Sequence, residues 1–253
     1  MTATAVPARL HAMHDARTLA RLAGAPAAPL CATIAMPLAA PGRPLGCFVE
    51  GNLLSPDFAF DAELPGQWIF TWSGTLAADL ASVSPANWMR GPQTLAAACD
   101  SLAPQLARHR RRLLLVPHAR HILSDARSAL TWWCERVIPG QDPAVVRTAP
   151  AGERAFGLAL DPGAMLEPSM LADAPDHLRS LVTHVGARAD AIILRDMAPS
   201  AQDPELLAPC SAGTGALPGA LLWELVREAV PETVPVLVPG GGLDRTLAWL
   251  GVR

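Results

Sequence analysis

From about residue 94 onward, short apolar runs alternate with segments whose apolar residues recur every three or four positions. Four runs have the length of buried β-strands: 113–116, 156–160, 191–194 and 234–238. Five periodic segments have the length of helices: 94–108, 125–137, 174–185, 217–230 and 243–250. Asp125 is placed to cap the second of these helices. Strands that alternate with amphipathic helices predict βα units and a parallel sheet buried on both faces.

The N-terminal third is less regular. Its periodicity predicts a helix over 9–22, and three apolar runs predict strands at 30–36, 45–50 and 67–72. A further strand at 144–147 brings the expected total to eight, which suits the length of a (β/α)8 barrel. We therefore predict an α/β TIM barrel that forms a single domain over 1–253 and is irregular in its N-terminal third. An open doubly wound sheet is the alternative, although no Gly-x-Gly-x-x-Gly motif follows the first strand.

Composition narrows the class of protein. Apolar residues make up 51% of the chain and charged residues 17%, which excludes a disordered protein. With a net charge of −3 we expect no nucleic-acid or membrane partner, and the basic run 108–112 is interpreted as a solvated helix end. All 20 basic residues are arginine, which excludes Schiff-base lysine chemistry. The odd number of cysteines, without a Cys-x-x-Cys pair, predicts a reducing, cytoplasmic location.

Polar residues that follow the strands are the candidates for chemistry, because a parallel barrel carries its site at the carboxyl ends of its strands. We expect four of them to act as acids, bases or proton carriers: Glu50, His118, His121 and Asp161. We expect six more to bind substrate: Trp72, Arg195, Asp196, Gly240, Gly241 and Gly242. The backbone N–H groups of the three glycines, which precede a helix, suit a phosphate.

Several of these candidates have a structural alternative. Asp161 stands before Pro162 and Gly163 and suits an Asx turn, and Arg195 with Asp196 suits a structural ion pair. The two histidines could be loop residues hydrogen-bonded to backbone. The glycine turn at 213–215 could bind a phosphate in the same way as the triple glycine.

From about Thr94 the order of segments resembles the xylose isomerase-like TIM barrels, the sugar phosphate isomerase/epimerase superfamily. Five pieces carry the resemblance: 113–118, 156–163, 191–196, 213–217 and, after a helix, 236–238. The resemblance implies a TIM barrel, isomerisation or epimerisation of a small sugar or polyol, and a divalent metal with Asp161 as a ligand.

The chain departs from the family at the other positions of the metal site. The resemblance aligns those positions with Val116, Ala164, Ile193 and Pro239, whose side chains cannot ligate a metal. A single carboxylate cannot hold a divalent ion tightly. Two functions therefore stay open: a sugar isomerase or epimerase, and a non-catalytic barrel, or pseudoenzyme, that binds a metabolite or a protein partner.

A second resemblance concerns the closing strands. The segments 190–194, 213–215 and 235–243 look like those of phosphate-binding barrels such as phosphoribosylanthranilate isomerase. That likeness implies a metal-independent isomerase whose two glycine turns hold a substrate phosphate. The catalytic-cysteine motif of that enzyme is not visible near Cys31. Substrate, metal and oligomeric state stay open.

Overall fold

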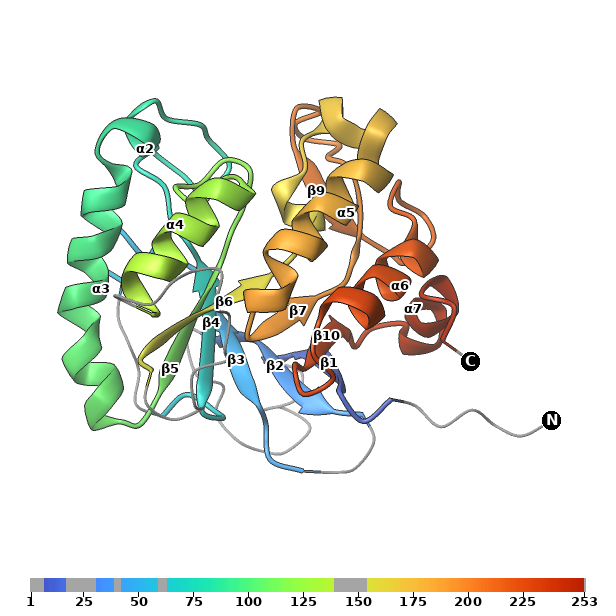
Figure 1. Cartoon of the computed structure of the whole chain (residues 1–253), viewed down its shortest axis with the longest axis horizontal. Helices are drawn as coiled ribbons and strands as arrows, with labels where there is room; N and C mark the ends of the chain where they lie inside the picture. The colour runs from blue at the N-terminus through green and yellow to red at the C-terminus, as the bar shows by residue number, and fades with distance from the viewer. Residues whose placement is uncertain (1–6, 17–30, 39–41, 59–62, 139–153, 253) are drawn as a thin grey trace.

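The computed structural model describes residues 7–16, 31–38, 42–58, 63–138 and 154–252. Eight strands close into a barrel in the order β1-β10-β7-β6-β5-β4-β3-β2. Their bounds are β1 Leu10–Asp15, β2 Cys31–Pro37, β3 Gly46–Val49, β4 Trp68–Trp72, β5 Arg112–Val116, β6 Phe156–Leu160, β7 Ala191–Ile193 and β10 Val236–Pro239. Helices flank the barrel on two sides, so the fold is the α/β TIM barrel that the sequence predicts (Figure 1). Closure excludes the open sheet.

Strand β1 stands where the sequence pattern predicts a helix over 9–22, and that prediction is wrong for Leu10–Asp15. Leu10 and Ala12 are buried and alternate with more exposed neighbours, as in a strand. β1 pairs with β10 on one side and β2 on the other, which closes the barrel. These pairings override the helical spacing of Leu10 and Met13, because strand formation depends on its neighbours more than on local sequence.

Strand β2 runs against the other seven strands. It pairs in antiparallel fashion with both β1 and β3, whereas the remaining neighbours around the barrel pair in parallel. The expectation of a wholly parallel sheet is therefore wrong at this strand. Antiparallel neighbours need no crossover helix, so the chain passes from β2 to β3 through residues 38–45. The predicted strand at 144–147 lies outside the described residues.

Side chains along the strands alternate between two cores. In β4, Trp68, Phe70 and Trp72 face the barrel interior, while Ile69 packs outward toward the helices. The interior is filled by side chains from other strands as well: Ala35, Leu114, Val116, Ala159, Ala191, Ile193 and Leu237. The barrel is a packed core, as TIM barrels are, and its open space lies at the mouth.

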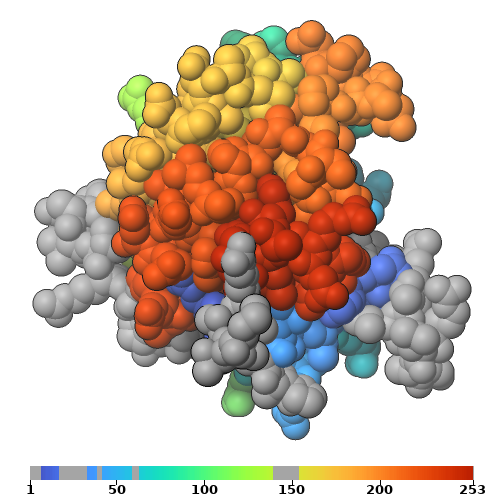
Figure 2. All heavy atoms as spheres, turned by 90° about the vertical axis from the view of Figure 1, so that its right-hand side faces the viewer, coloured from blue at the N-terminus to red at the C-terminus, as the bar shows by residue number. Residues whose placement is uncertain are grey.

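The five helices predicted after residue 94 are present, and a further short helix, Ala86–Met89, was not predicted. Their bounds are α2 Ala86–Met89, α3 Gly91–Arg108, α4 Ala126–Arg136, α5 Ala174–His184, α6 Gly219–Ala229 and α7 Leu243–Trp249. The Asp125 side chain accepts the Ser128 N–H at 2.7 Å, so Asp125 caps α4 as predicted. Helices α2 to α4 lie on one side of the barrel and α5 to α7 on the other (Figure 1). The last third of the chain covers much of the face in Figure 2.

A hairpin between β7 and α6 is absent from the sequence prediction. Its strands are β8 Asp196–Pro199 and β9 Leu207–Cys210, and they form a two-stranded sheet of their own. Both are four residues long and each contains a proline, so neither carries a clear strand pattern.

The basic run 108–112 is only partly a solvated helix end. Arg112 begins β5 and is 7% exposed, and its guanidinium lies 2.6 Å from the carboxylate of Asp190. Arg154 pairs with the same carboxylate at 3.2 Å, and the Leu158 N–H donates to it at 3.1 Å. The interpretation is therefore wrong for Arg112, which is buried and forms an ion pair with a residue 78 positions further along the chain. None of the helices in the described ranges is long and apolar enough to cross a membrane.

Candidate functional site

The mouth of the barrel is reached by continuing the inward-facing positions of three strands. Trp72 ends β4 two residues after Phe70, Asp161 follows Ala159 of β6 by two residues, and Arg195 follows Ile193 of β7 by two. Since side chains on one face of a strand recur every second residue, these three side chains come to the same opening. The sequence signal for these candidates was their position at the carboxyl ends of the predicted strands.

A cavity of about 220 Å³ lies at this opening. It is lined by four of the predicted site residues, namely Trp72, His118, His121 and Arg195. The rest of its wall is apolar and comes from the loop after β4 and from the hairpin: Leu80, Ala81, Met197, Leu206, Leu207, Ala208 and Pro209. These seven residues were not predicted, because nothing in the sequence pattern indicates that the two segments meet.

Arg195 is held between a carboxylate and an aromatic ring. Its Nε donates to Oδ2 of Asp161 at 2.5 Å, and its guanidinium carbon lies 5.5 Å from the centroid of the Trp72 ring. Asp161 is fully buried, and its Oδ1 accepts the N–H of Ala164 at 3.1 Å. Asp161 therefore forms the Asx-type turn and also an ion pair, and it fixes Arg195 from behind the cavity.

The two histidines lie side by side at the edge of Trp72. The ring centroids of the two histidines are 4.6 Å apart. The centroid of the Trp72 ring lies 5.4 Å from that of His118 and 5.7 Å from that of His121. Burial lowers the pKa of His118 to about 3, with smaller effects of the same sign from His121, Arg195 and Arg120. Burial also lowers the pKa of His121 to about 4, against the opposing hydrogen bond to Leu80. Both imidazoles are neutral at pH 7.

The hydrogen bonds of the neutral rings define where their protons sit. The Nδ1 of His118 accepts the N–H of Arg120 at 3.1 Å, so the proton of this ring is on Nε2. The Nε2 of His121 donates to the carbonyl oxygen of Leu80 at 3.0 Å, and its Nδ1 is buried without a partner among the described residues. Both histidines thus bond to backbone, as the structural alternative predicts, and both also line the cavity.

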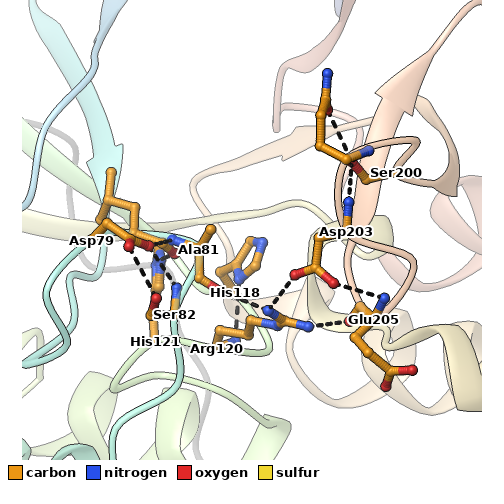
Figure 3. A network of polar contacts seen from close by, with 11 residues as sticks. Asp79, Ala81, Ser82, His118, Arg120, His121, Ser200, Asp203 and Glu205 are labelled. Atoms are coloured by element: carbon orange, nitrogen blue, oxygen red, sulfur yellow. Dashed lines mark hydrogen bonds and ion pairs between the residues drawn. The ribbon is translucent and has the colours of Figure 1, made fainter.

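Arg120 ties the loops around the cavity together (Figure 3). Its Nη1 donates to the carbonyl oxygen of Ala81 at 2.7 Å and lies 3.1 Å from the carboxylate of Asp203. Its Nη2 donates to the carbonyl oxygen of Glu205. One side chain from the loop after β5 therefore bridges the loop after β4 and the loop of the β8–β9 hairpin. No pattern in the sequence indicates this role of Arg120.

Glu50 and Asp196 are among the predicted residues that do not line the cavity. Glu50 follows β3, is exposed and is not part of the cavity wall. Asp196 is 1% exposed and accepts four backbone N–H groups, those of Met197, Gly213, Gly215 and Leu217, at 2.8 to 3.1 Å. Its carboxylate therefore occupies the glycine turn 213–215 in place of a phosphate, and it pairs with backbone rather than with Arg195.

The triple glycine lies beside β1 rather than in the cavity wall. The Gly240 N–H donates to the Met13 carbonyl at 2.8 Å, and a Cβ on Gly240 would meet the His14 ring at 2.6 Å. Gly242 has a φ of +70° as the residue before α7, a conformation that favours glycine. Close approach of His14 and this left-handed turn explain the need for glycine at these two positions.

The donor set at the mouth does not fit a divalent metal. Both carboxylate oxygens of Asp161 are engaged, one by a backbone N–H and the other by the guanidinium of Arg195. Within the described part of the chain, no three His, Cys, Asp or Glu residues lie close enough to hold a metal ion together. A divalent cation at Asp161 would have to displace a cation that the protein already supplies.

Solved structures of xylose isomerase-like TIM barrels are similar to this chain. A xylose isomerase domain protein from Planctomyces limnophilus shares 17% identity, with a TM-score of 0.45 over 74% of this chain and 58% of that one. D-psicose 3-epimerase, solved in the presence of D-fructose, shares 12%, with a TM-score of 0.46 over 74% of this chain and 59% of that one. Endonuclease IV from Thermus thermophilus shares 12%, with a TM-score of 0.47 over 74% of this chain and 63% of that one.

The aligned part spans less than two thirds of the length of these three proteins. Neither a protein-family model nor a curated protein sequence matches the chain. The names of the three structures describe different activities, and one fold hosts many functions. The likeness therefore concerns the fold, and the chemistry has to be argued from the residues of this chain.

Proposed function

We propose that the chain is a small-molecule-binding barrel whose ligand occupies the cavity at the mouth. The observation that supports this most directly is the convergence of Trp72, His118, His121 and Arg195, from three separate segments, on one cavity with an otherwise apolar wall. A mostly apolar pocket with a few oriented polar groups is the usual form of a small-molecule site.

The proposed ligand is small. The cavity of about 220 Å³ lies below the roughly 300–1,000 Å³ of sites for drug-sized molecules. Binding in this proposal needs no divalent metal, because Arg195 already supplies a positive charge at Asp161. The proposal corresponds to the non-catalytic barrel among the functions that the sequence leaves open.

Ligand-observed NMR with a panel of small sugars, polyols, carboxylates and amides tests this proposal. Ala208 lines the cavity from β9 and is half-buried, so Ala208→Phe fills the cavity with little strain on the core. Ala201→Phe, at an exposed position in the same hairpin, is the matched control. We expect at least one member of the panel to bind and to lose binding in Ala208→Phe only. Binding that persists in Ala208→Phe, or no binding by any member, would overturn the proposal.

A second candidate is the isomerisation or epimerisation of a sugar or polyol, without a metal. It is favoured by the two imidazoles that line the cavity next to Arg195. Neutral histidines with pKa values of about 3 and about 4 are weak bases, however, and suit hydrogen bonding better than proton abstraction.

Deuterium exchange separates the two candidates. A base that removes a proton beside a carbonyl introduces deuterium at that carbon when a ketose or aldose is incubated in D2O. Exchange that is catalysed by the protein and lost in His118→Gln or His121→Gln would support the isomerase. Ligand binding without any such exchange would support the non-catalytic barrel.

A further inference from the structure

The cavity wall carries a single charge among the described residues, and that charge is positive. In the part of the wall that the structure describes, Arg195 is the only Arg, Asp or Glu, and both histidines are neutral at pH 7. Asp161, which pairs with Arg195, is fully buried behind it and does not line the cavity. A ligand in the cavity therefore contacts the guanidinium of Arg195 and not the carboxylate of Asp161.

The guanidinium of Arg195 is fixed in position and has hydrogen-bond donors that no described residue uses. Its Nε is engaged by Asp161 and its plane lies near the Trp72 ring, while its Nη groups make no hydrogen bond or ion pair within the described ranges. An arginine fork with both Nη groups available suits the two oxygens of a carboxylate. Because Asp161 and Trp72 fix its position in advance, little side-chain entropy is lost when a ligand binds.

His118 supplies a second donor at the same cavity. Its Nδ1 is used by the Arg120 N–H, so its Nε2 carries the proton, and that atom has no partner in the part of the chain that the structure describes. Arg195 and Arg120 both contribute to the low pKa of His118, after burial and the His121 ring, which places positive potential at this imidazole. The free polar side-chain groups of Arg195 and His118 are thus donors.

Building on the proposed function, we infer that the ligand is a small monocarboxylate whose carboxylate pairs with the Nη groups of Arg195 and whose apolar body packs against Trp72 and the hairpin wall. Met197, Leu207 and Pro209 provide that wall. A phosphate ester is disfavoured because its second negative charge would find no second cation in the described wall.

Benzoate and benzamide test the charge requirement, because the two molecules have the same shape and size. We expect benzoate to bind and benzamide to bind at least about tenfold more weakly, since a charge-assisted pair is roughly twice as strong as a neutral hydrogen bond. Binding is measured by isothermal titration calorimetry and by competition NMR at two salt concentrations. Equal or tighter binding of benzamide overturns the inference, and so does a panel in which only sugars or polyols bind.

Variants at Arg195 test the assignment of the residue. Arg195→Gln alone leaves Asp161 buried without its cation, so the double variant Asp161→Asn/Arg195→Gln, which removes both charges, is the primary one. We expect it to lose the preference for benzoate over benzamide while keeping its fold by circular dichroism. Arg127→Gln, at an exposed position on α4, is the control and should keep the preference. An unchanged preference in the double variant overturns the assignment.

The two proposals fail in different ways. If neutral members of the panel bind in the cavity and carboxylates do not, the proposal of a small-molecule site is supported and the proposal of a carboxylate ligand is overturned. If nothing binds, or if binding survives Ala208→Phe, the site itself falls.

Discussion

His118 and His121 lie with their ring centroids 4.6 Å apart, and burial keeps both imidazoles neutral by lowering their pKa values to about 3 and about 4. In the unfolded chain these groups titrate near 6.5. Protonation below that pH therefore favours the unfolded state. The contribution of the pair to stability is complete above about pH 6.5 and is lost progressively as the pH falls to the folded-state pKa values of about 4 for His121 and about 3 for His118.

We expect the free energy of unfolding to decrease by about 2 kcal/mol for each histidine between pH 7.5 and pH 5. Urea unfolding at the two pH values measures this decrease. The double variant His118→Gln/His121→Gln should show a smaller decrease, whereas His184→Gln, at an exposed position on α5, should behave as the unsubstituted chain does. The same decrease in the double variant as in the parent would contradict the explanation.

Removal of the Arg120 side chain should loosen the loops around the cavity. Arg120→Ala breaks the contacts to Ala81, Asp203 and Glu205 without touching the barrel core. We expect amide exchange to accelerate by at least about tenfold in 200–207, because local opening there loses a charge-assisted hydrogen bond worth about 1.5 kcal/mol or more. Hydrogen exchange with mass spectrometry measures this, with Arg127→Ala as the control. Unchanged amide exchange in 200–207 would show that the Arg120 side chain does not stabilise these loops.

Neutralising Asp190 should destabilise the amino end of the barrel. Asp190→Asn leaves the buried Arg112 and the largely buried Arg154 without their shared carboxylate. We expect the free energy of unfolding to fall by about 3–5 kcal/mol, as it does when one partner of a buried ion pair is removed. Asp100→Asn removes a surface pair with Arg136, whose partner Asp100 is 67% exposed, and should cost less than about 1 kcal/mol. Similar effects of the two substitutions in urea unfolding would contradict this difference.

Asp196→Asn should destabilise the turn 213–215. The substitution places an amide N–H₂ against one pair of the four backbone donors that the carboxylate now accepts. We expect a loss of at least about 2 kcal/mol in the free energy of unfolding and faster amide exchange at Gly213 and Gly215. Asp244→Asn, at an exposed position in α7, is the control. If the amides of Gly213 and Gly215 exchange as slowly in the variant as in the parent, the Asp196 carboxylate does not stabilise the turn.

Much of the site was predictable from the sequence, because inward-facing residues recur every second position along a strand. That alternation places Trp72 and Arg195 at one opening and brings Asp161 behind them. Among the candidates that do not line the cavity, Glu50 and Asp196 show the limit of this reasoning. A strand-end position says that a residue is near the mouth, but loop geometry decides whether its side chain faces the cavity or the backbone.

The sequence by itself determined the helices after residue 94, four of the barrel strands there and the cap at Asp125, because these follow from local periodicity and local hydrogen bonding. Only the tertiary structure decided that Leu10–Asp15 is a strand, that β2 runs against its neighbours, and that Asp161 pairs with a guanidinium. Each of these depends on a partner far along the chain. Pairing and burial between distant segments set strand direction, charge partners and the pKa of a buried group, and no local pattern encodes them.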